Sequence, residues 1–326
     1  MPANLPPQYF EAEKIFRAAK NPPEKIAALE DMLAIMPKHK GTDHLRAELR
    51  SRIAKLNQQA GKKSGGARAS MMIDKEGAGQ VAVTGLPNAG KSHLVAAITK
   101  AAPTVAEYPL TTHSALPGMM DFKDIKIQLI DTPPLAPQTI QWWLPPMLRQ
   151  ADVLLIIIDL SYDPLAQMEE IKSQLAKMRI LIGDSQADTD DDETIYWPKK
   201  ALIAGNKADL DNGGSYKLLM KNYGDIAPVI AISSTQGSGL DDLRLAVYNI
   251  LDIIRVYTKA PGQKADLGDP IVLPAGSSLR DAAASVHKDF AAKLKFARIW
   301  GSGKHDGVMA KRDHILADGD VIELHL

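Results

Sequence analysis

The sequence predicts an α/β fold in which a mainly parallel sheet is covered by helices. From residue 80 onward, apolar runs of strand length alternate with helical patterns. The run at 153–158 is apolar throughout, as expected for a parallel strand that is buried on both faces. A glycine-rich loop follows another of these strands, at 85–92. Because ligands bind such sheets at the carboxyl ends of the strands, we expect the functional site at that edge.

The composition narrows the class of protein. A length of 326 residues favours two or three domains. The 39 basic residues equal the 39 acidic ones, so the overall charge does not favour nucleic acid binding. Cysteine is absent, which excludes disulfides and thiolate metal sites and fits a reducing compartment. No apolar run is long enough to cross a membrane, and no signal core opens the chain. We therefore expect a soluble, cytoplasmic protein without a membrane partner, and a monomer.

Residues 1–60 are predicted to form a helical hairpin, and residues 61–79 a linker. Asn21 followed by Pro22 and Pro23 is typical of a helix start, and apolar residues then recur at helical spacing. The linker is rich in glycine and small or basic residues. The polar side of the second helix is basic, and this side is either a solvated face or an RNA-contacting surface. Its basic residues are Arg46, Arg50, Arg52 and Lys55.

The glycine-rich loop is predicted to bind phosphates, because it lies between a strand and a helix as a P-loop does. Glycines at both ends let the backbone turn its N–H groups toward phosphate oxygens. Lys91 can reach the β- and γ-phosphates, and the Ser92 hydroxyl can bind Mg²⁺. The positive end of the following helix would face the phosphates. In order, the loop consists of Gly85, Leu86, Pro87, Asn88, Ala89, Gly90, Lys91 and Ser92.

A second motif predicts that the bound base is guanine. Asn206, Lys207 and Asp209 follow a predicted strand. The Asp209 carboxylate can accept from both the N1–H and the 2-amino group of guanine, and adenine offers no such pair of donors. Asn206 can brace the phosphate loop, and the aliphatic stem of Lys207 can cover the base. After the next strand, Ser233, Ser234 and Thr235 can offer backbone N–H groups to guanine O6.

Two further segments fit a site that responds to the γ-phosphate. Asp131 follows an alternating strand and can hold Mg²⁺ through a water molecule. The segment 108–112 lies between the loop's helix and the next strand and contains two threonines. A threonine there can bind Mg²⁺ only while the γ-phosphate is present, so hydrolysis would release the segment.

Together these motifs resemble those of the Obg-related GTPases, within the TRAFAC class. Residues 39–56 are similar to the helical region of the DRG branch, and 255–326 resemble its TGS domain, a small ubiquitin-like β-grasp fold. The resemblance implies a GTPase domain at 80–254 that binds GTP and GDP, requires Mg²⁺, and converts GTP to GDP and phosphate. It also implies association with the ribosome, ribosomal RNA or a translation-associated protein. By position, Thr112 is the expected Mg²⁺ ligand of the switch segment, and it acts with Lys91 in catalysis.

Two residues depart from the family pattern. Pro134 stands where the family usually has a glycine whose N–H contacts the γ-phosphate, and proline has no N–H. Leu135 stands where many small GTPases place a water-orienting glutamine. We therefore expect slow intrinsic hydrolysis. A GTP-dependent RNA- or ribosome-binding scaffold with negligible turnover is the alternative, and an ATPase is a third interpretation that Asp209 opposes.

Asn88 indicates a compensation for these departures. In relatives with asparagine at this loop position, a K⁺ ion bridges the phosphates and replaces an arginine finger. The resemblance thus implies Asn88 as a K⁺ ligand and K⁺ as a second cofactor beside Mg²⁺, whereas Asn88 as an ordinary loop residue is the other interpretation.

Three more segments are open to two interpretations each. The tandem tryptophans at 142–143 either pack in the core or form a surface that changes with the nucleotide. The acidic stretch 184–193 lacks the glycine and the spacing of a Ca²⁺-binding loop, so we interpret it as a solvated insertion. The basic stretch 286–315 could meet phosphate backbones or be solvated. The basic residues chosen to test this are Lys293, Lys295 and Arg298.

Overall fold

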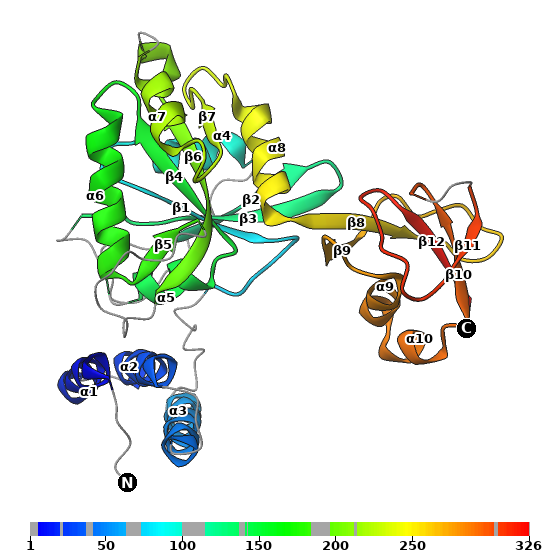
Figure 1. Cartoon of the computed structure of the whole chain (residues 1–326), viewed down its shortest axis with the longest axis horizontal. Coiled ribbons are helices and arrows are strands. Elements are labelled where there is room, and N and C mark those ends of the chain that lie inside the picture. Colours follow the sequence, from blue (N-terminus) through cyan, green and yellow to red (C-terminus); the bar gives the residue numbers. More distant parts are fainter. Residues whose placement is uncertain are drawn as a thin grey trace.

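The computed structural model contains an N-terminal group of helices, a central α/β domain and a small C-terminal α+β domain (Figure 1). This arrangement confirms the predicted α/β class and the mainly parallel sheet. The structure describes residues 6–19, 22–36, 42–62, 73–99, 115–136, 141, 143–183, 196–211, 214–302 and 306–325.

The N-terminal part contains three described helices: α1 (Pro7–Ala18), α2 (Pro22–Ile35) and α3 (Asp43–Lys62). Helices α2 and α3 lie where the sequence predicts the hairpin, and α1 is an additional helix. Proline at the start of α1 fits a helix N-terminus, and Tyr9 and Ala12 are buried in one apolar cluster with Leu29 and Leu49. This burial explains why a helix with a short apolar stripe is stable here.

Arg46 does not belong to a solvated basic face. Its guanidinium donates to the backbone carbonyls of Leu33 (3.3 Å) and Met36 (2.8 Å) at the end of α2. The last carbonyls of a helix have no partner within the helix, so Arg46 satisfies groups that would otherwise need water. Arg52 forms an exposed ion pair with Glu48 (2.6 Å), which contributes little to stability.

The central sheet has the strand order β2-β3-β1-β4-β6-β5, and β7 pairs with β6. All pairs are parallel except β2 with β3, which form an antiparallel hairpin. Every residue of β4 is buried, as its apolar sequence predicts. The strands are β1 (Gln80–Gly85), β2 (Leu116–Phe122), β3 (Ile125–Asp131), β4 (Val153–Asp159), β5 (Ile180–Ile182), β6 (Trp197–Asn206) and β7 (Val229–Ala231).

Helices cover both faces of this sheet. One apolar cluster includes Leu144 of α5, Met168 of α6 and Leu219 of α7, and a second includes Leu94 of α4 and Leu243 of α8. Because both faces are covered, the carboxyl ends of the strands are the open edge. The helices are α4 (Lys91–Ile98), α5 (Leu144–Gln150), α6 (Pro164–Lys177), α7 (Ser215–Tyr223) and α8 (Leu240–Leu251), with the short 3-10 helix η1 (Ala208–Leu210).

The N-terminal helices contact the central domain near the end of α5, which lies next to them in Figure 1. Arg149 of α5 donates to the Asp31 carboxylate of α2 (2.8 Å) and to the Met178 carbonyl (2.8 Å). Its guanidinium also lies over the Trp197 ring, 4.1 Å from the centroid. One largely buried arginine therefore links the two parts through a charge pair and a cation–π contact.

The C-terminal domain is a five-stranded sheet in the order β11-β10-β12-β8-β9. Its core includes Leu279 and Ala283 of α9 packed against Ile299 and Ile322 of the sheet. Helix α9 begins with a capping box between Ser278 and Asp281, which satisfies two backbone donors. The elements are β8 (Ile253–Thr258), β9 (Ile271–Pro274), α9 (Leu279–Val286), α10 (Lys288–Lys293), β10 (Phe296–Trp300), β11 (Val308–Ala310) and β12 (Val321–His325).

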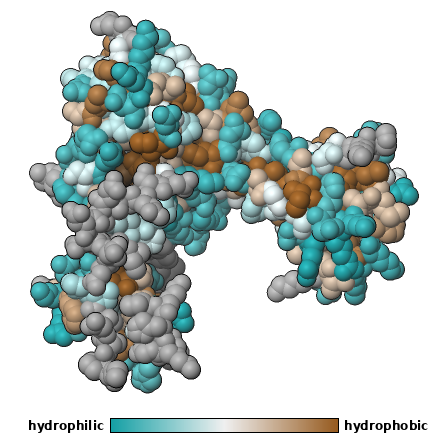
Figure 2. Space-filling view, in the orientation of Figure 1, coloured by the Kyte–Doolittle hydropathy of each residue, from teal (hydrophilic) through white to brown (hydrophobic). Residues whose placement is uncertain are grey.

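Strand β8 connects the central and C-terminal domains, so the predicted boundary between residues 254 and 255 falls inside it. On the face shown in Figure 2, the two domains meet through a narrow neck. The contacts at this neck therefore determine how firmly the domains are attached.

Arg255 is the centre of these contacts, with a side chain that is 9% exposed. Its guanidinium pairs with Asp124 in the β2–β3 turn and, at 2.8 Å, with Asp318 before β12. The hydroxyl of Tyr248 on α8 donates to Asp318 (2.6 Å), and that of Tyr257 donates to Asp124. Removing one partner of a fully buried ion pair typically costs about 3–5 kcal/mol, and the partial exposure of both carboxylates here reduces that cost.

We predict that Asp318→Asn weakens the attachment in a pH-dependent manner. Burial alone would raise the pKa of Asp318, but hydrogen bonds from Arg255 and Tyr248 outweigh burial and lower it to about 2. Because the folded-state pKa is depressed, the stabilisation is present above the unfolded pKa and is lost as pH falls through the folded one. Because a third of the Asp318 side chain is exposed, we expect Asp318→Asn to lower the free energy of unfolding by about 1–2 kcal/mol at neutral pH.

Differential scanning calorimetry would measure this effect, with the exposed Asp313→Asn as the matched control. The difference in stability between the wild type and Asp318→Asn should be constant between about pH 8 and pH 5. It should become smaller between about pH 4 and pH 3. A deficit that stays the same down to pH 3 would contradict the role of the Asp318 charge.

Candidate nucleotide-binding site

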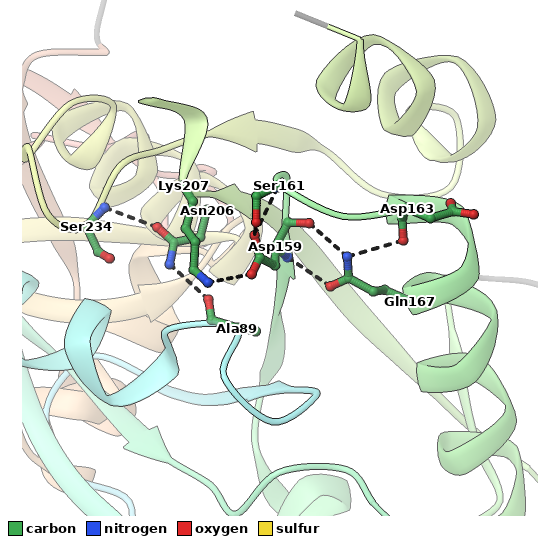
Figure 3. Close-up of polar contacts among 8 residues, drawn as sticks. All are labelled: Ala89, Asp159, Ser161, Asp163, Gln167, Asn206, Lys207 and Ser234. Carbon is green, nitrogen blue, oxygen red and sulfur yellow. Dashed lines mark hydrogen bonds and ion pairs between the residues drawn. The ribbon is translucent and has the colours of Figure 1, made fainter. Parts of the chain in front are cut away.

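Four parallel strands bring the predicted site residues to one edge of the sheet. The strand register places Gly85 of β1 beside Ile157 of β4, and Asp159 of β4 beside Asn206 of β6. Strand β3 ends at Asp131 on the other side of β1. The phosphate-loop and base-recognition motifs, which are about 120 residues apart in the sequence, are therefore neighbours in space (Figure 3).

The loop conformation requires its glycines. Gly90 has φ +92°, and a Cβ added there would lie 2.3 Å from Nδ2 of Asn206. Gly85 has φ +153°, and its Cβ would lie 2.5 Å from the carbonyl oxygen of Ile157. Asn88 also has a positive φ of 62°, which asparagine tolerates better than most residues. The backbone thus packs too closely against β4 and β6 for side chains at these two glycines.

Lys91 is held inside the loop, with 6% of the residue exposed. Its ammonium donates to the carbonyls of Gly85 (3.2 Å) and Leu86 (2.9 Å). Burial lowers the pKa of Lys91, and the nearby Asp131 carboxylate partly opposes this shift. A buried cation bound only by neutral carbonyls is well suited to exchange them for anionic phosphate oxygens.

Asp131 is the buried carboxylate of the site, with 8% of the residue exposed. Burial raises its pKa, and a hydrogen bond from the Ser92 hydroxyl and the Lys91 charge oppose the rise. Its Oδ1 atom is buried and has no hydrogen-bond partner among the residues that the structure describes. A carboxylate and a hydroxyl oxygen side by side fit Mg²⁺, which prefers hard oxygen ligands.

The described parts of the chain contain no group of three or more His, Cys, Asp or Glu residues that could hold a metal ion. A site built on Asp131 and Ser92 would therefore need oxygen ligands from water and from a bound nucleotide. This is the usual way in which proteins bind Mg²⁺ together with phosphates.

Asn206 joins three loops of the site (Figure 3). It is 1% exposed. Its Nδ2 donates to the Ala89 carbonyl in the phosphate loop (2.9 Å), and its Oδ1 accepts from the backbone N–H of Ser234 (3.1 Å). One side-chain amide thus fixes the phosphate loop relative to both base-recognition loops.

Asp159 is a member of this network that the sequence motifs missed. It forms an ion pair with Lys207 and accepts from the Ser161 N–H (2.9 Å) and hydroxyl (2.6 Å). Burial opposes ionisation, but the hydrogen bonds from Lys207 and Ser161 together lower the pKa of Asp159. Gln167 bonds both backbone groups of Asp159 (3.0 and 2.8 Å). The feature of the sequence that could have identified Asp159 is its position directly after the apolar run 153–158.

Asp209 and the loop after β7 occupy the positions from which a base could be read. Asp209 lies exposed in η1 and makes no hydrogen bond to another described residue. The backbone N–H groups of Ser233 and Ser234 do not point to a ligand, because they donate to the Ser238 carbonyl (3.0 Å) and to Asn206. The expectation that these two groups bind guanine O6 is therefore corrected. Of the three N–H groups expected at guanine O6, that of Thr235 has no acceptor among described residues.

Several predicted features do not contribute side chains to this edge. Leu135 is fully buried in the apolar cluster of α5 and α6, and its N–H donates to the Gly85 carbonyl (3.0 Å). Trp143 is 5% exposed in the same cluster, which favours the core interpretation for this tryptophan. Thr112 and the rest of segment 108–112, Trp142 and the whole acidic stretch 184–193 lie outside the described residues.

Comparisons with known proteins agree with this geometry. Residues 80–185 match the 50S ribosome-binding GTPase family, and residues 254–326 match the TGS domain family. The chain is 27% identical to developmentally-regulated GTP-binding protein 1 of Xenopus laevis and 26% identical to ribosome-interacting GTPase 1 of Saccharomyces cerevisiae. Each alignment covers 92% of this chain and 98% of the relative. A GTP-binding protein from Pyrococcus horikoshii shares the fold, with a TM-score of 0.51 and 16% identity, over 76% of this chain and 99% of that one.

The fold and the phosphate loop define a P-loop GTPase. Along the chain, a domain that matches the 50S ribosome-binding GTPase family is followed by a TGS domain, and relatives aligned over most of its length are named developmentally-regulated GTP-binding proteins. Among the described residues, no helix has the length and apolar character needed to span a membrane.

We predict that Gly90→Ala reduces GDP affinity at least about 10-fold. The new Cβ would meet the Asn206 amide and would occupy a backbone conformation that costs alanine about 1–2 kcal/mol. Isothermal titration calorimetry with GDP measures the loss. Gly214→Ala is the matched control, because Gly214 has φ −98° and its Cβ would meet no atom within 4 Å. Wild-type affinity in a folded Gly90→Ala protein would contradict the required close approach.

Proposed function

We propose that this GTPase hydrolyses GTP to GDP and phosphate and acts as a slow molecular switch. The observation that supports the proposal is that two buried charged groups lie together at the phosphate loop and that both have room for a further charged partner. The Lys91 ammonium is bound only by loop carbonyls, and one oxygen of Asp131 lacks a partner among described residues. Both groups fit the charges of a nucleotide triphosphate with its metal ion.

Transfer of the γ-phosphoryl group requires mainly charged groups that are held in the correct positions. Lys91 and the loop N–H groups would bind the phosphate oxygens and stabilise negative charge as the γ-phosphoryl group is transferred. Ser92 and, through water, Asp131 would hold Mg²⁺, with Thr112 as the further ligand. When bound, Mg²⁺ neutralises charge on the phosphate oxygens. Leu135 is buried in the core, so it cannot orient the attacking water, which supports a slow intrinsic rate.

Guanine selectivity would come from Asp209 together with the Thr235 N–H. Asp209 accepts from the N1–H and 2-amino groups, whereas the Thr235 N–H donates to O6, and adenine matches neither pattern. The ion pair with Asp159 would hold Lys207 so that its aliphatic stem covers the base. Competition binding should therefore show that GTP displaces GDP and that ATP does not.

We predict that Asp131→Asn reduces the single-turnover hydrolysis rate by about 10²-fold or more, because the site loses its only described carboxylate beside Ser92. The increase of GDP affinity with Mg²⁺ should also disappear, which gives a readout apart from turnover. Asp225→Asn, on an exposed loop, is the control. If wild-type protein hydrolyses GTP no faster than Asp131→Asn, the scaffold alternative with negligible turnover replaces the switch.

We propose Asn88 as a ligand of a stimulating K⁺ ion. Its side chain is exposed at the loop and makes no hydrogen bond to a described residue, so the amide oxygen is available. Hydrolysis should be faster in KCl than in NaCl at equal ionic strength, and Asn88→Ala should remove the difference. Equal rates of the wild-type protein in both salts would exclude K⁺ as a cofactor.

We also propose a ribosome-linked role, in which ribosomal RNA or a translation-associated protein is the partner. The name of the yeast relative and the description of the matched GTPase family support it. Lys293, Lys295 and Arg298 are exposed in the C-terminal domain, where they could meet phosphate groups. Sedimentation with ribosomes under GDP and a GTP analogue tests the role. Charge reversal at these three residues should weaken co-sedimentation, whereas reversal at Lys217 and Lys221 on α7 should not.

A further inference from the structure

The nucleotide site contains a histidine to which none of the motifs assigns a role. His93 is the third residue of α4, two residues after Lys91. Its Nδ1 lies 3.1 Å from the hydroxyl oxygen of Ser234, within hydrogen-bond distance. Ser234 is 8% exposed and belongs to the loop after β7, 141 residues later in the sequence. This contact therefore joins the phosphate-binding helix directly to the loop that faces the base.

The contact closes a ring of hydrogen bonds. From the phosphate loop, the Ala89 carbonyl accepts from Asn206 (2.9 Å), and Asn206 accepts from the Ser234 N–H (3.1 Å). The Ser234 hydroxyl then reaches His93, which directly follows the phosphate loop and lies four residues after Ala89. Ser234 is thus held from two sides, through its backbone by Asn206 and through its side chain by His93.

The two contacts that hold Ser234 also affect the next residue, Thr235. Its N–H has no acceptor among described residues, whereas the N–H groups of Ser233 and Ser234 donate within the protein. The orientation of a peptide N–H depends on the dihedral angles of the residue before it, which here is Ser234. A fixed Ser234 therefore fixes the direction in which the Thr235 N–H points, and such preorganisation favours binding.

We propose that His93 is a positioning residue for guanine recognition. By holding the Ser234 hydroxyl, it orients the Thr235 N–H toward O6 of the base. This proposal rests on the proposed placement of guanine between Asp209 and the loop after β7. It differs from a role in phosphate binding, which the position of His93 in the first turn of α4 would otherwise suggest.

The experiment compares two nucleotides that differ at position 6 of the base. GDP carries O6, whereas 6-thioguanosine diphosphate carries sulfur there, which is a much weaker acceptor, and keeps the N1–H, the 2-amino group and the same diphosphate. Affinities of wild type, His93→Ala, Ser234→Ala and the double variant are measured by competition against a fluorescent GDP analogue. For GDP, His93→Ala should weaken binding about 5- to 20-fold, the usual effect of losing one hydrogen bond in a buried site.

Three results are expected if His93 acts through the loop. The loss caused by His93→Ala should largely vanish with the 6-thio nucleotide, because its sulfur is a poor acceptor for the Thr235 N–H. The double variant should be no weaker than Ser234→Ala alone, since the two side chains act as one unit. His93→Asn, which places an amide near the position of Nδ1, should recover most of the GDP affinity.

The controls separate this proposal from its alternatives. The exposed His44→Ala on α3 should bind both nucleotides like the wild type, and thermal unfolding shows whether each variant is folded. An equal loss of affinity for both nucleotides would show that His93 acts on the phosphates and would overturn the proposal. Wild-type GDP affinity in His93→Ala would overturn it too. Failure of the wild-type protein to bind GDP would instead contradict the proposed function.

Discussion

The hydrogen bonds of the Asn206 side chain are the interaction on which the rest of the site depends. Asn206 is almost completely buried and connects the phosphate loop at Ala89 with the base-reading loop at Ser234. A buried amide without partners is costly, so the fold is stable only when both loops adopt the conformations that satisfy it. Gly90 then has no space for a side chain, and Lys207, the next residue, is directed to Asp159.

Two of the places where the described structure buries charge have different consequences. At the phosphate loop, Lys91 and Asp131 are incompletely satisfied, and burial shifts both pKa values against ionisation. Such groups gain most from a charged ligand. Around Arg255, each charge has a described partner, and the pKa of Asp318 is lowered. That cluster is suited to holding two domains together.

One strand connects these two places. Strand β3 begins at Ile125, next to Asp124 in the Arg255 cluster, and ends at Asp131 in the nucleotide site. The hairpin of β2 and β3 therefore lies between the nucleotide and the attachment point of the C-terminal domain.

The sequence by itself determined the fold class, the phosphate loop and the candidate guanine motif. Those signals are local, because a ligand group such as a phosphate or a guanine edge requires particular side chains at consecutive positions after a strand. Asp159 and His93 were missed, and of the three N–H groups predicted to face the base, those of Ser233 and Ser234 donate within the protein instead. Only the tertiary structure decided these, because they depend on strand register and on which backbone donors are already occupied by residues far away in the chain. The same holds for helix α1 and for Arg255, whose partners Asp124 and Asp318 are brought together by packing alone.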